Sequence, residues 1–340
     1  MPFSPVTASE HITEKYKRYL RTIFSINDTQ LSSQFKKLLD EHGLFSKGPY
    51  LEVNDSFEKG KSLERLIEEE KIAKSFIRIN MPLSRPLYKH QEIAIEKVLS
   101  GKNIVVSTGT GSGKTESFLV PLLNEIICEH EAGKLNAGVR ALLIYPMNAL
   151  ANDQIERLRG LLSDFPEITY GSYTGQTKHK YQDALAEYKA LNDNQEPLSN
   201  ELISREQIKE TPPNILVTNY AMLEYLLVRP DDNVFFCEEH AGKWKYIVLD
   251  EAHVYHGGSG IEVSMLLRRL KATLQNNDIK YILTSATLGG DDSNNEVAEF
   301  AENLCGSKFN AADVVRAYRI TPKATGDKNS LSPDFYSAVA

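Results

Sequence analysis

The chain has 340 residues, of which 41% are hydrophobic and 25% charged, and its formal net charge is −7. These values are typical of a folded globular protein with one large core or two modest ones. The negative charge argues against a protein that coats nucleic acid through a generally positive surface, so any such contact must be local.

Cysteine usage and hydropathy exclude further classes of protein. The three cysteines have no CxxC spacing, which argues against a zinc site and a disulfide framework. The sequence has neither a signal peptide nor a long apolar run. We therefore expect a cytoplasmic protein with no membrane contact.

Residues 1–80 are predicted to form a helical N-terminal region. Apolar side chains recur at helical spacing from Tyr16 to Phe24 and from Phe35 to Leu39, and Gly43 indicates a turn. No chemistry is apparent in this region. Packing against the rest of the protein is a better expectation than contact with a substrate.

A glycine-rich loop follows the β-branched run at 104–106, which predicts a buried strand. Residues 108–115 read Thr-Gly-Thr-Gly-Ser-Gly-Lys-Thr, and a helical apolar pattern follows. The glycines permit backbone N–H groups to surround phosphate oxygens at the positive end of that helix. Lys114 is expected to contact the β- and γ-phosphates, and the Thr115 hydroxyl to ligate Mg²⁺. The predicted ATP-binding residues here are Thr108, Gly109, Thr110, Gly111, Ser112, Gly113, Lys114, Thr115 and Glu116.

Two further apolar runs, 141–144 and 214–217, predict strands that are each followed by small polar residues. Hydroxyls, amides and helix N-termini at these positions can bind phosphate oxygens without reading sequence. As the family resemblance given below implies, the expected nucleic-acid contacts are Pro146, Asn148, Thr174, Gly175, Thr218 and Asn219. An alternative is that such residues cap helices. The polar segment 176–213, with a helix expected from Tyr181 to Leu191, is either a charged surface flap or an element that gates the substrate.

An acidic pair follows a third apolar run, at 246–249. Asp250 comes 136 residues after Lys114, and Glu251-Ala252-His253 follows it. Carboxylates at the carboxyl end of a parallel strand lie where such sheets bind ligands. Asp250 is expected to hold Mg²⁺ and Glu251 to activate the attacking water. An isolated sequence of this kind is usually an exposed helix start, but the glycine loop favours the catalytic interpretation.

Strands alternate with amphipathic helices from about residue 85 to 305. This pattern predicts an α/β fold with a parallel sheet covered by helices on both faces. We assign 81–305 to a nucleotide-binding domain and 306–340 to a linker or the start of another domain. Another strand is expected at 282–283. Beyond it, the Ser285 and Thr287 hydroxyls are predicted to reach Asp250 or His253 and sense the γ-phosphate, although an ordinary Ser/Thr turn is an alternative.

These segments resemble the motifs of superfamily 2 helicases. The glycine loop resembles motif I, whose first position is commonly Ala or Thr, as at Thr108; the usual phosphate-loop pattern has glycine there. Asp250–His253 is similar to the DEAH form of motif II, and 284–287 to motif III. Further similarities are those of 87–91 to the adenine-reading Q-type motif, 145–154 to motif Ia, 173–175 to the TxGx-type motif and 218–223 to motif Ib.

The resemblance is greatest to Lhr/MrfA-like bacterial DNA helicases, including large antiphage-defence helicases, and covers about residues 80–305. It implies a RecA-like P-loop lobe that uses ATP and Mg²⁺, with Lys114, Asp250, Glu251 and His253 as catalytic residues. The Gln91 amide could then recognise adenine, or it could cap a helix.

The implied activity is that of an ATP-dependent DNA helicase or translocase acting on single-stranded or partly duplex DNA. Such a motor needs a second RecA lobe, in cis or in trans, to supply an arginine finger. After Leu288 the sequence has Arg316 and Arg319 only, in no such pattern. Two alternatives are an RNA-directed remodeller and a nucleotide-binding module that is not a motor.

Overall fold

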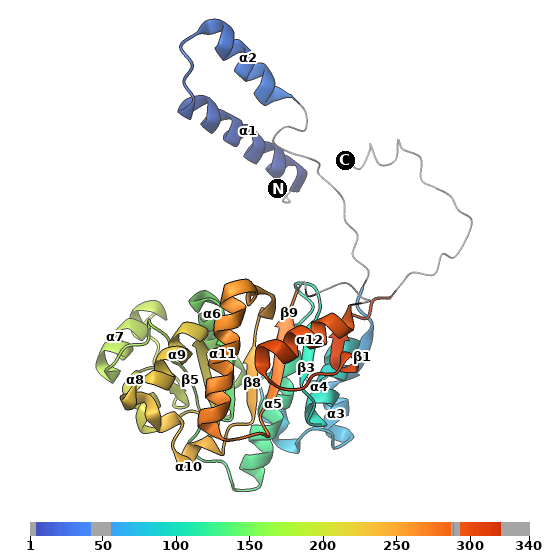
Figure 1. The fold of residues 1–340 in the computed structure, drawn as a ribbon, viewed down its shortest axis with the longest axis vertical. Helices are drawn as coiled ribbons and strands as arrows, with labels where there is room; N and C mark the ends of the chain where they lie inside the picture. Colours follow the sequence, from blue (N-terminus) through green and yellow to red (C-terminus); the bar gives the residue numbers. More distant parts are fainter. Residues whose placement is uncertain (1–4, 42–55, 287, 289–292, 321–340) are drawn as a thin grey trace, which may run out of the picture. The chain divides into compact units, whose positions relative to one another are not determined.

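The computed structural model describes residues 5–41, 56–286, 288 and 293–320. The chain divides into two compact units, and the larger one spans Phe57–Ile320. The described residues of the smaller unit form α1 (Pro5–Ile23) and α2 (Thr29–Asp40), shown in blue in Figure 1. Both helices were predicted from the apolar spacing.

The two N-terminal helices are joined by polar contacts. The Asp28 side chain accepts a hydrogen bond of 2.8 Å from the backbone of Leu31 and so caps α2. Arg21 on α1 forms an ion pair of 3.0 Å with Asp40 at the end of α2. Several large apolar side chains of this unit are exposed, among them Ile12, Tyr19 and Leu31.

The larger unit contains an eight-stranded sheet in which every strand pair is parallel. Its strand order is β10-β3-β9-β8-β4-β7-β5-β6. The strands are β3 (Ile104–Ser107), β4 (Ala141–Tyr145), β5 (Tyr170–Ser172), β6 (Glu201–Leu202), β7 (Ile215–Asn219), β8 (Tyr246–Leu249), β9 (Lys280–Ser285) and β10 (Val314–Arg316).

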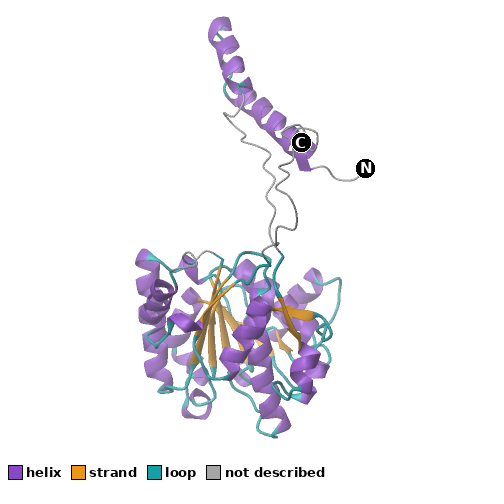
Figure 2. Cartoon of the chain, turned by 90° about the vertical axis from the view of Figure 1, so that its right-hand side faces the viewer, coloured by secondary structure: helices purple, strands orange, loops and turns teal. Residues whose placement is uncertain are grey.

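Helices cover both faces of this sheet, as Figure 2 shows from its side. One core contains residues of α4 (Lys89–Leu99), α5 (Lys114–Glu131) and α6 (Asn148–Leu161). The other contains residues of α9 (Tyr220–Val228), α11 (Gly257–Leu274) and α12 (Asn294–Cys305). Successive strand residues alternate between the cores: Val105 belongs to one and Val106 to the other. The predicted α/β fold is confirmed.

The compact unit extends beyond the predicted domain limits of 81 and 305. At its start, β1 (Lys59–Ser62) pairs with β2 (Pro86–Tyr88), and α3 (Leu63–Glu68) and η1 (Lys74–Arg78) follow β1. Leu63 and Phe76 are buried in the same core as α4 and α5. At its end, β10 pairs with β3, next to the glycine loop. The added strands β1 and β10 read Lys-Gly-Lys-Ser and Val-Val-Arg, so neither contains an apolar run of three residues.

The polar segment 176–213 is an ordered part of the lobe. It contains α7 (Tyr181–Leu191), which begins and ends where the sequence predicted, then β6 and α8 (Arg205–Glu210). Between β7 and β8 lie η2 (Pro230–Phe235) and α10 (Glu238–Ala241), and η3 (Ala252–Val254) and η4 (Ala311–Asp313) are single turns. In the described part of the chain, no helix is long and apolar enough to cross a bilayer.

Candidate nucleotide and strand-binding sites

The glycine loop joins the end of β3 to the start of α5. Gly111 and Gly113 have φ of 73°, a region that favours glycine. A Cβ at Gly113 would also lie 2.3 Å from the amide nitrogen of Gln91. Gly109 differs from the expectation, because its φ is not positive and its Cβ position is open. Two of the three glycines therefore have a conformational reason to be glycine.

Residues in the first turn of α4 hold the glycine loop in place. His90 Nε2 lies 2.8 Å from the Ser112 carbonyl, and Gln91 Nε2 donates to the Gly113 carbonyl over 2.9 Å. Burial lowers the pKa of His90, which favours the neutral ring. Gln91 Oε1 accepts from the Tyr88 backbone at 2.7 Å. Both ends of the Gln91 amide are thus engaged inside the protein.

The adenine-reading role of Gln91 stays a prediction. Gln91 is 3% exposed and does not line the cavity beside the glycine loop. In this structure Gln91 completes a capping box at the start of α4, which is the helix-capping role given as the alternative to adenine recognition. To reach a base, its side chain would have to leave both of its present partners.

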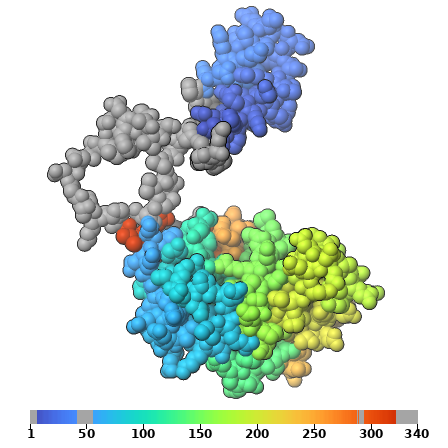
Figure 3. All heavy atoms as spheres, turned by 180° about the vertical axis from the view of Figure 1, so that it is seen from behind, coloured from blue at the N-terminus to red at the C-terminus, as the bar shows by residue number. Residues whose placement is uncertain are grey.

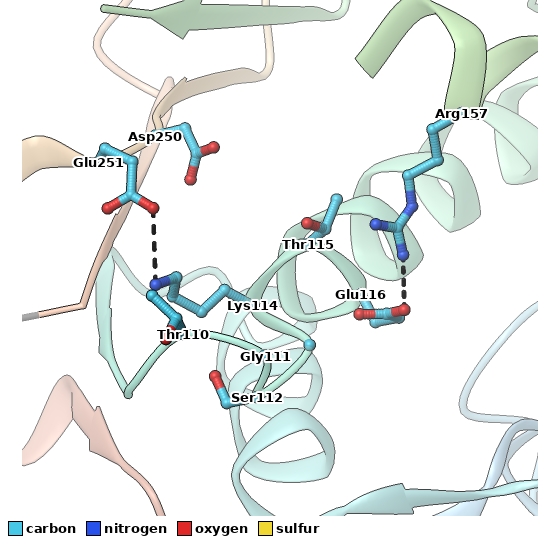
Figure 4. A pocket seen from close by; sticks show the side chains of 10 residues that line it. Thr110, Gly111, Ser112, Lys114, Thr115, Glu116, Arg157, Asp250 and Glu251 are labelled. Carbon is cyan, nitrogen blue, oxygen red and sulfur yellow. Dashed lines mark hydrogen bonds and ion pairs between the residues drawn. The ribbon is translucent and has the colours of Figure 1, made fainter. Parts of the chain in front are cut away.

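A cavity of about 380 Å³ lies between the glycine loop and the acidic pair (Figure 4). Thr110–Glu116 line one side, and Asp250 and Glu251 line the other. Lys114 extends across it, with Nζ 3.7 Å from Glu251 Oε1 and 3.3 Å from the Thr108 carbonyl. Thr108 and Gly109 do not line the cavity; the buried Thr108 hydroxyl lies 2.6 Å from that of Ser112. The cavity brings together residues that are 136 positions apart.

The acidic pair follows β8, one strand removed from β3 across β9. Burial raises the pKa of Asp250, while a hydrogen bond from Thr284 opposes that change. Glu251 has φ of 51°, uncommon for a residue with a side chain, at a position that faces the cavity. The backbone N–H of Glu251 donates to the Thr284 hydroxyl over 3.3 Å. Thr284 therefore contacts both acidic residues.

The end of β9 connects this pair to His253. Ser285 Oγ lies 3.2 Å from His253 Nδ1, which is 3.3 Å from Glu251 Oε2. The predicted contact of Ser285 with His253 is present. The hydroxyl that reaches Asp250 is that of Thr284, which the sequence interpretation did not select; Thr287 lies outside the described residues. Ser285 also accepts the backbone N–H of Thr108 through its carbonyl, at 3.1 Å, which joins β9 to the glycine loop.

Arg157 is a cavity residue that sequence reasoning missed. It extends from α6, and its guanidinium lies 2.6 Å from Glu116 Oε1 (Figure 4). Glu116 is 8% exposed, and its other oxygen is 3.4 Å from Gln91 Nε2. The sequence offers no local signal for Arg157, because it lies within an ordinary amphipathic helix, far along the chain from the glycine loop.

The predicted strand-binding loops follow three neighbouring strands. Pro146 follows β4, Asn219 ends β7, and Thr174 and Gly175 follow β5, and these strands are adjacent in the order β4-β7-β5. Asn219 Nδ2 donates to Asn148 Oδ1 over 2.7 Å, so two of the loops are in contact. All of these loops open at the edge that carries the cavity, displaced from β3 along the sheet.

Two of the predicted contact side chains have structural roles. Thr218 is fully buried, and its hydroxyl donates to the Tyr173 carbonyl at 2.7 Å. Thr174 is 1% exposed, and its hydroxyl accepts the Gln176 N–H at 3.3 Å. Both hydroxyls are therefore engaged within the protein here, and phosphate contact by Thr174 and Thr218 stays a prediction. Gly175 is exposed, and Pro146, Asn148 and Asn219 are partly exposed.

Comparison with known proteins gives consistent matches. The family model described as DEAD/DEAH box helicase matches residues 88–295, more than half of the chain. The Druantia protein DruE of Escherichia coli is 29% identical over 87% of the chain, and the uncharacterized ATP-dependent helicase YprA of Bacillus subtilis is 29% identical over 76%. The DUF1998 helicase MrfA bound to DNA and AMPPNP is 25% identical over 77%, with a TM-score of 0.55.

The matched proteins are much longer than this chain. The chain spans 21% of DruE, 32% of YprA and 31% of the MrfA chain. The matches therefore concern only a part of each of these proteins.

Proposed function

The chain belongs to the DEAD/DEAH box helicase family, and we propose that it is the ATP-binding lobe of an ATP-dependent DNA helicase or translocase. The observation that carries this proposal is the shared cavity of the glycine loop and the acidic pair. A lysine, a threonine hydroxyl and two carboxylates around one cavity suit a triphosphate and its cation.

Mg²⁺ fits the residues present. Thr115 and Asp250 offer the hard oxygen donors that it prefers, and both line the cavity. No group of three or more acidic, His or Cys side chains in the described ranges could hold a metal alone. A site with only one or two protein ligands is expected where substrate phosphates complete the Mg²⁺ coordination. When bound, Mg²⁺ would neutralise charge on the phosphate oxygens.

The protein residues have separable tasks in ATP hydrolysis. Lys114 exchanges its contact with Glu251 for the terminal phosphates, which leaves the Glu251 carboxylate available to orient and deprotonate water. Thr284 holds both acidic residues from β9. Ser285 and His253 extend this hydrogen-bonded connection, through which the nucleotide state would be communicated.

DNA is the proposed track. The MrfA relative is bound to DNA, and the loops after β4, β7 and β5 offer amides and backbone groups suited to phosphates. A role in antiphage defence is consistent with the similarity to the Druantia protein DruE. An RNA-directed remodeller with the same lobe is the alternative, and competition between DNA and RNA single strands for stimulated ATPase would distinguish the two.

Efficient turnover is proposed to need a second RecA lobe. Arg316 donates a hydrogen bond of 2.8 Å to the Ser107 hydroxyl within this lobe. The Arg319 guanidinium lies 5.4 Å from the centroid of the Phe57 ring. An arginine supplied from another lobe accelerates phosphoryl transfer about 10³–10⁵-fold. We expect this chain alone to bind ATP and hydrolyse it slowly.

The test compares nucleotide binding and turnover in matched variants. Lys114→Ala removes the phosphate partner and should cost about 2 kcal/mol or more, about 30-fold in the affinity for a nonhydrolysable ATP analogue. Lys134→Ala, at an exposed lysine beyond the far end of α5, should bind like the wild type. Equal affinity in all three proteins would contradict the proposed site.

Turnover is measured with single-stranded DNA and a second RecA lobe present, supplied in cis or in trans. Glu251→Gln should retain analogue binding and lose stimulated hydrolysis. Wild-type turnover in this variant would remove Glu251 from its role. If the unsubstituted protein shows almost no turnover with DNA and both lobes present, the chain is a nucleotide-binding module instead.

A further inference from the structure

The segment 176–213 forms one wall of a second cavity, of about 930 Å³, to which the proposed ATPase cycle assigns no role. We call it the insertion groove. Its lining residues come from four stretches of the chain. These are 152–159 in α6, 171–179 at and after the end of β5, 183–192 in and just after α7, and 201–205 in and just after β6. Figure 3 shows the yellow-green surface of the segment containing α7 beside the green surface of the preceding part of the chain.

The wall of the groove is held by a buried carboxylate. Arg159 makes two contacts of 2.8 Å with Glu201, one to each oxygen. The Tyr188 and Tyr170 hydroxyls each lie 3.3 Å from the same carboxylate. Burial, reinforced by this carboxylate, raises the pKa of both tyrosines, which keeps the hydroxyls protonated as donors. The bidentate pair cancels its own charge, so this part of the wall is not an anion site.

The wall also offers surfaces suited to flat ligands. The Arg159 guanidinium lies 4.9 Å from the centroid of the Tyr188 ring, and both residues line the groove. Leu191, at the end of α7, also lines it and is 78% exposed, unlike the core leucines of the lobe. An aromatic ring, a guanidinium plane and an apolar side chain are the groups on which unstacked bases pack.

The groove is continuous with the predicted strand-binding loops. Gly175 and Gln176 line it, and a Cβ at Gly175 would meet nothing within 4 Å. Asn152, which also lines it, lies one helical turn after Asn148 on α6, so the two share a face. A strand whose phosphates contact these loops would therefore have its bases close to the groove.

We propose that the insertion groove binds unstacked bases of the single-stranded DNA that passes over the loops after β4, β7 and β5. The bases pack on Tyr188 and Leu191, while the phosphates remain at the loops. This inference rests on the proposed strand-binding function. It gives segment 176–213 a direct role in holding the track.

The test measures the affinity of variants for a fluorescent single-stranded oligonucleotide by anisotropy, in the full chain with a nonhydrolysable ATP analogue. Tyr188→Ala and Leu191→Ala should each weaken binding about tenfold, within the range measured for loss of a base–side-chain stack. Tyr181→Ala is the matched control, because Tyr181 is on the same helix and 37% exposed but does not line the groove. Unchanged analogue binding verifies the fold of each variant.

A second oligonucleotide, with a central abasic stretch, separates bases from backbone. It should bind the wild type about tenfold more weakly and be insensitive to Leu191→Ala. An equal effect of Leu191→Ala on both oligonucleotides would mean that the groove contacts sugar and phosphate, and would overturn the inference. Wild-type affinity in both groove variants would also overturn it.

Photo-crosslinking from 4-thiothymidine supplies an independent readout that does not depend on substitution. Crosslinks to residues 183–192 are expected, and crosslinks confined to other parts of the lobe would refute base binding in the groove. If the unsubstituted protein binds neither DNA nor RNA single strands, the proposed strand-binding function itself fails, and that result is distinct from the others.

Discussion

Glu116 and Arg157 form an ion pair at the rim of the nucleotide cavity. A carboxylate so close to a bound polyphosphate is unfavourable unless a cation neutralises it. Arg157 supplies that cation from α6, with Arg85 4.0 Å from the same carboxylate as a second. The pair is therefore expected to affect nucleotide affinity, because it neutralises a carboxylate that lines the cavity.

Arg157→Ala is predicted to weaken ATP-analogue binding about five- to tenfold, an effect of about 1–1.4 kcal/mol, because it leaves Glu116 unneutralised. Adding Glu116→Gln should restore part of the affinity. The measurement is a calorimetric titration of both variants, with Arg269→Ala as the control, since the ion pair of Arg269 with Glu224 is outside the cavity. If the double variant binds no better than Arg157→Ala, the effect does not act through Glu116.

Among the individual residues of the cavity, the sequence identified those that belong to contiguous motifs. Lys114 and Glu251 could be predicted because the glycine loop and the acidic pair are contiguous motifs. Arg157 could not, because its approach to Glu116 depends on how α6 packs beside α5. The internal hydrogen bonds of the Thr174 and Thr218 hydroxyls could not be predicted either, because a polar residue beside a strand end can bond a neighbouring loop or a ligand.

Among the elements, α6 links the two predicted sites. Its first residue, Asn148, accepts a hydrogen bond from Asn219, and Arg157 reaches the nucleotide cavity from its last turns. Their separation of nine positions spans about 14 Å of helix. Asn219 in turn caps α9, since its Oδ1 accepts the Met222 N–H at 2.7 Å. One asparagine therefore serves helix stability and loop contact.

Substitutions at Asn219 should separate these two roles. Asn219→Ala removes the cap and should lower the free energy of unfolding by about 1 kcal/mol, measured by urea denaturation. Asn219→Ser can still cap α9, so it should retain stability. Neither variant can donate an amide hydrogen to Asn148, so both should bind the oligonucleotide more weakly. Equal stability of the two variants would show that the cap contributes nothing.

Elements with an apolar run or a helical pattern were predictable, and those without either were not. The strands β3, β4, β7, β8 and β9 coincide with apolar runs, and α7 coincides with a helical pattern. By contrast, β5 reads Tyr-Gly-Ser and β6 has two residues, so neither shows a periodicity. Both form because neighbouring strands offer them backbone partners, which is tertiary information.

For the whole molecule, the net charge of −7 constrains how the proposed DNA strand would be held. The proposed contacts are amides, backbone groups and a base-binding groove, and few of these displace counterions. The logarithm of the oligonucleotide association constant should therefore fall with the logarithm of salt concentration with a slope of about −1 to −2, equivalent to roughly two or three cationic contacts on a single strand.

Fluorescence anisotropy between low and moderate salt gives that slope directly. Lys178→Ala, which removes an exposed cation at the groove, should make the slope shallower by less than about 1. A slope steeper than about −5 would indicate a basic surface that the described loops do not provide, and would contradict this mode of binding.

The position of β10 has a mechanical consequence. Because β10 is parallel to β3, its carboxyl end lies at the sheet edge that carries the glycine loop. A domain attached beyond the described residues would therefore be tethered on the triphosphate side of the sheet, which raises its effective concentration there. Its tether would not have to cross the sheet for the domain to approach the γ-phosphate.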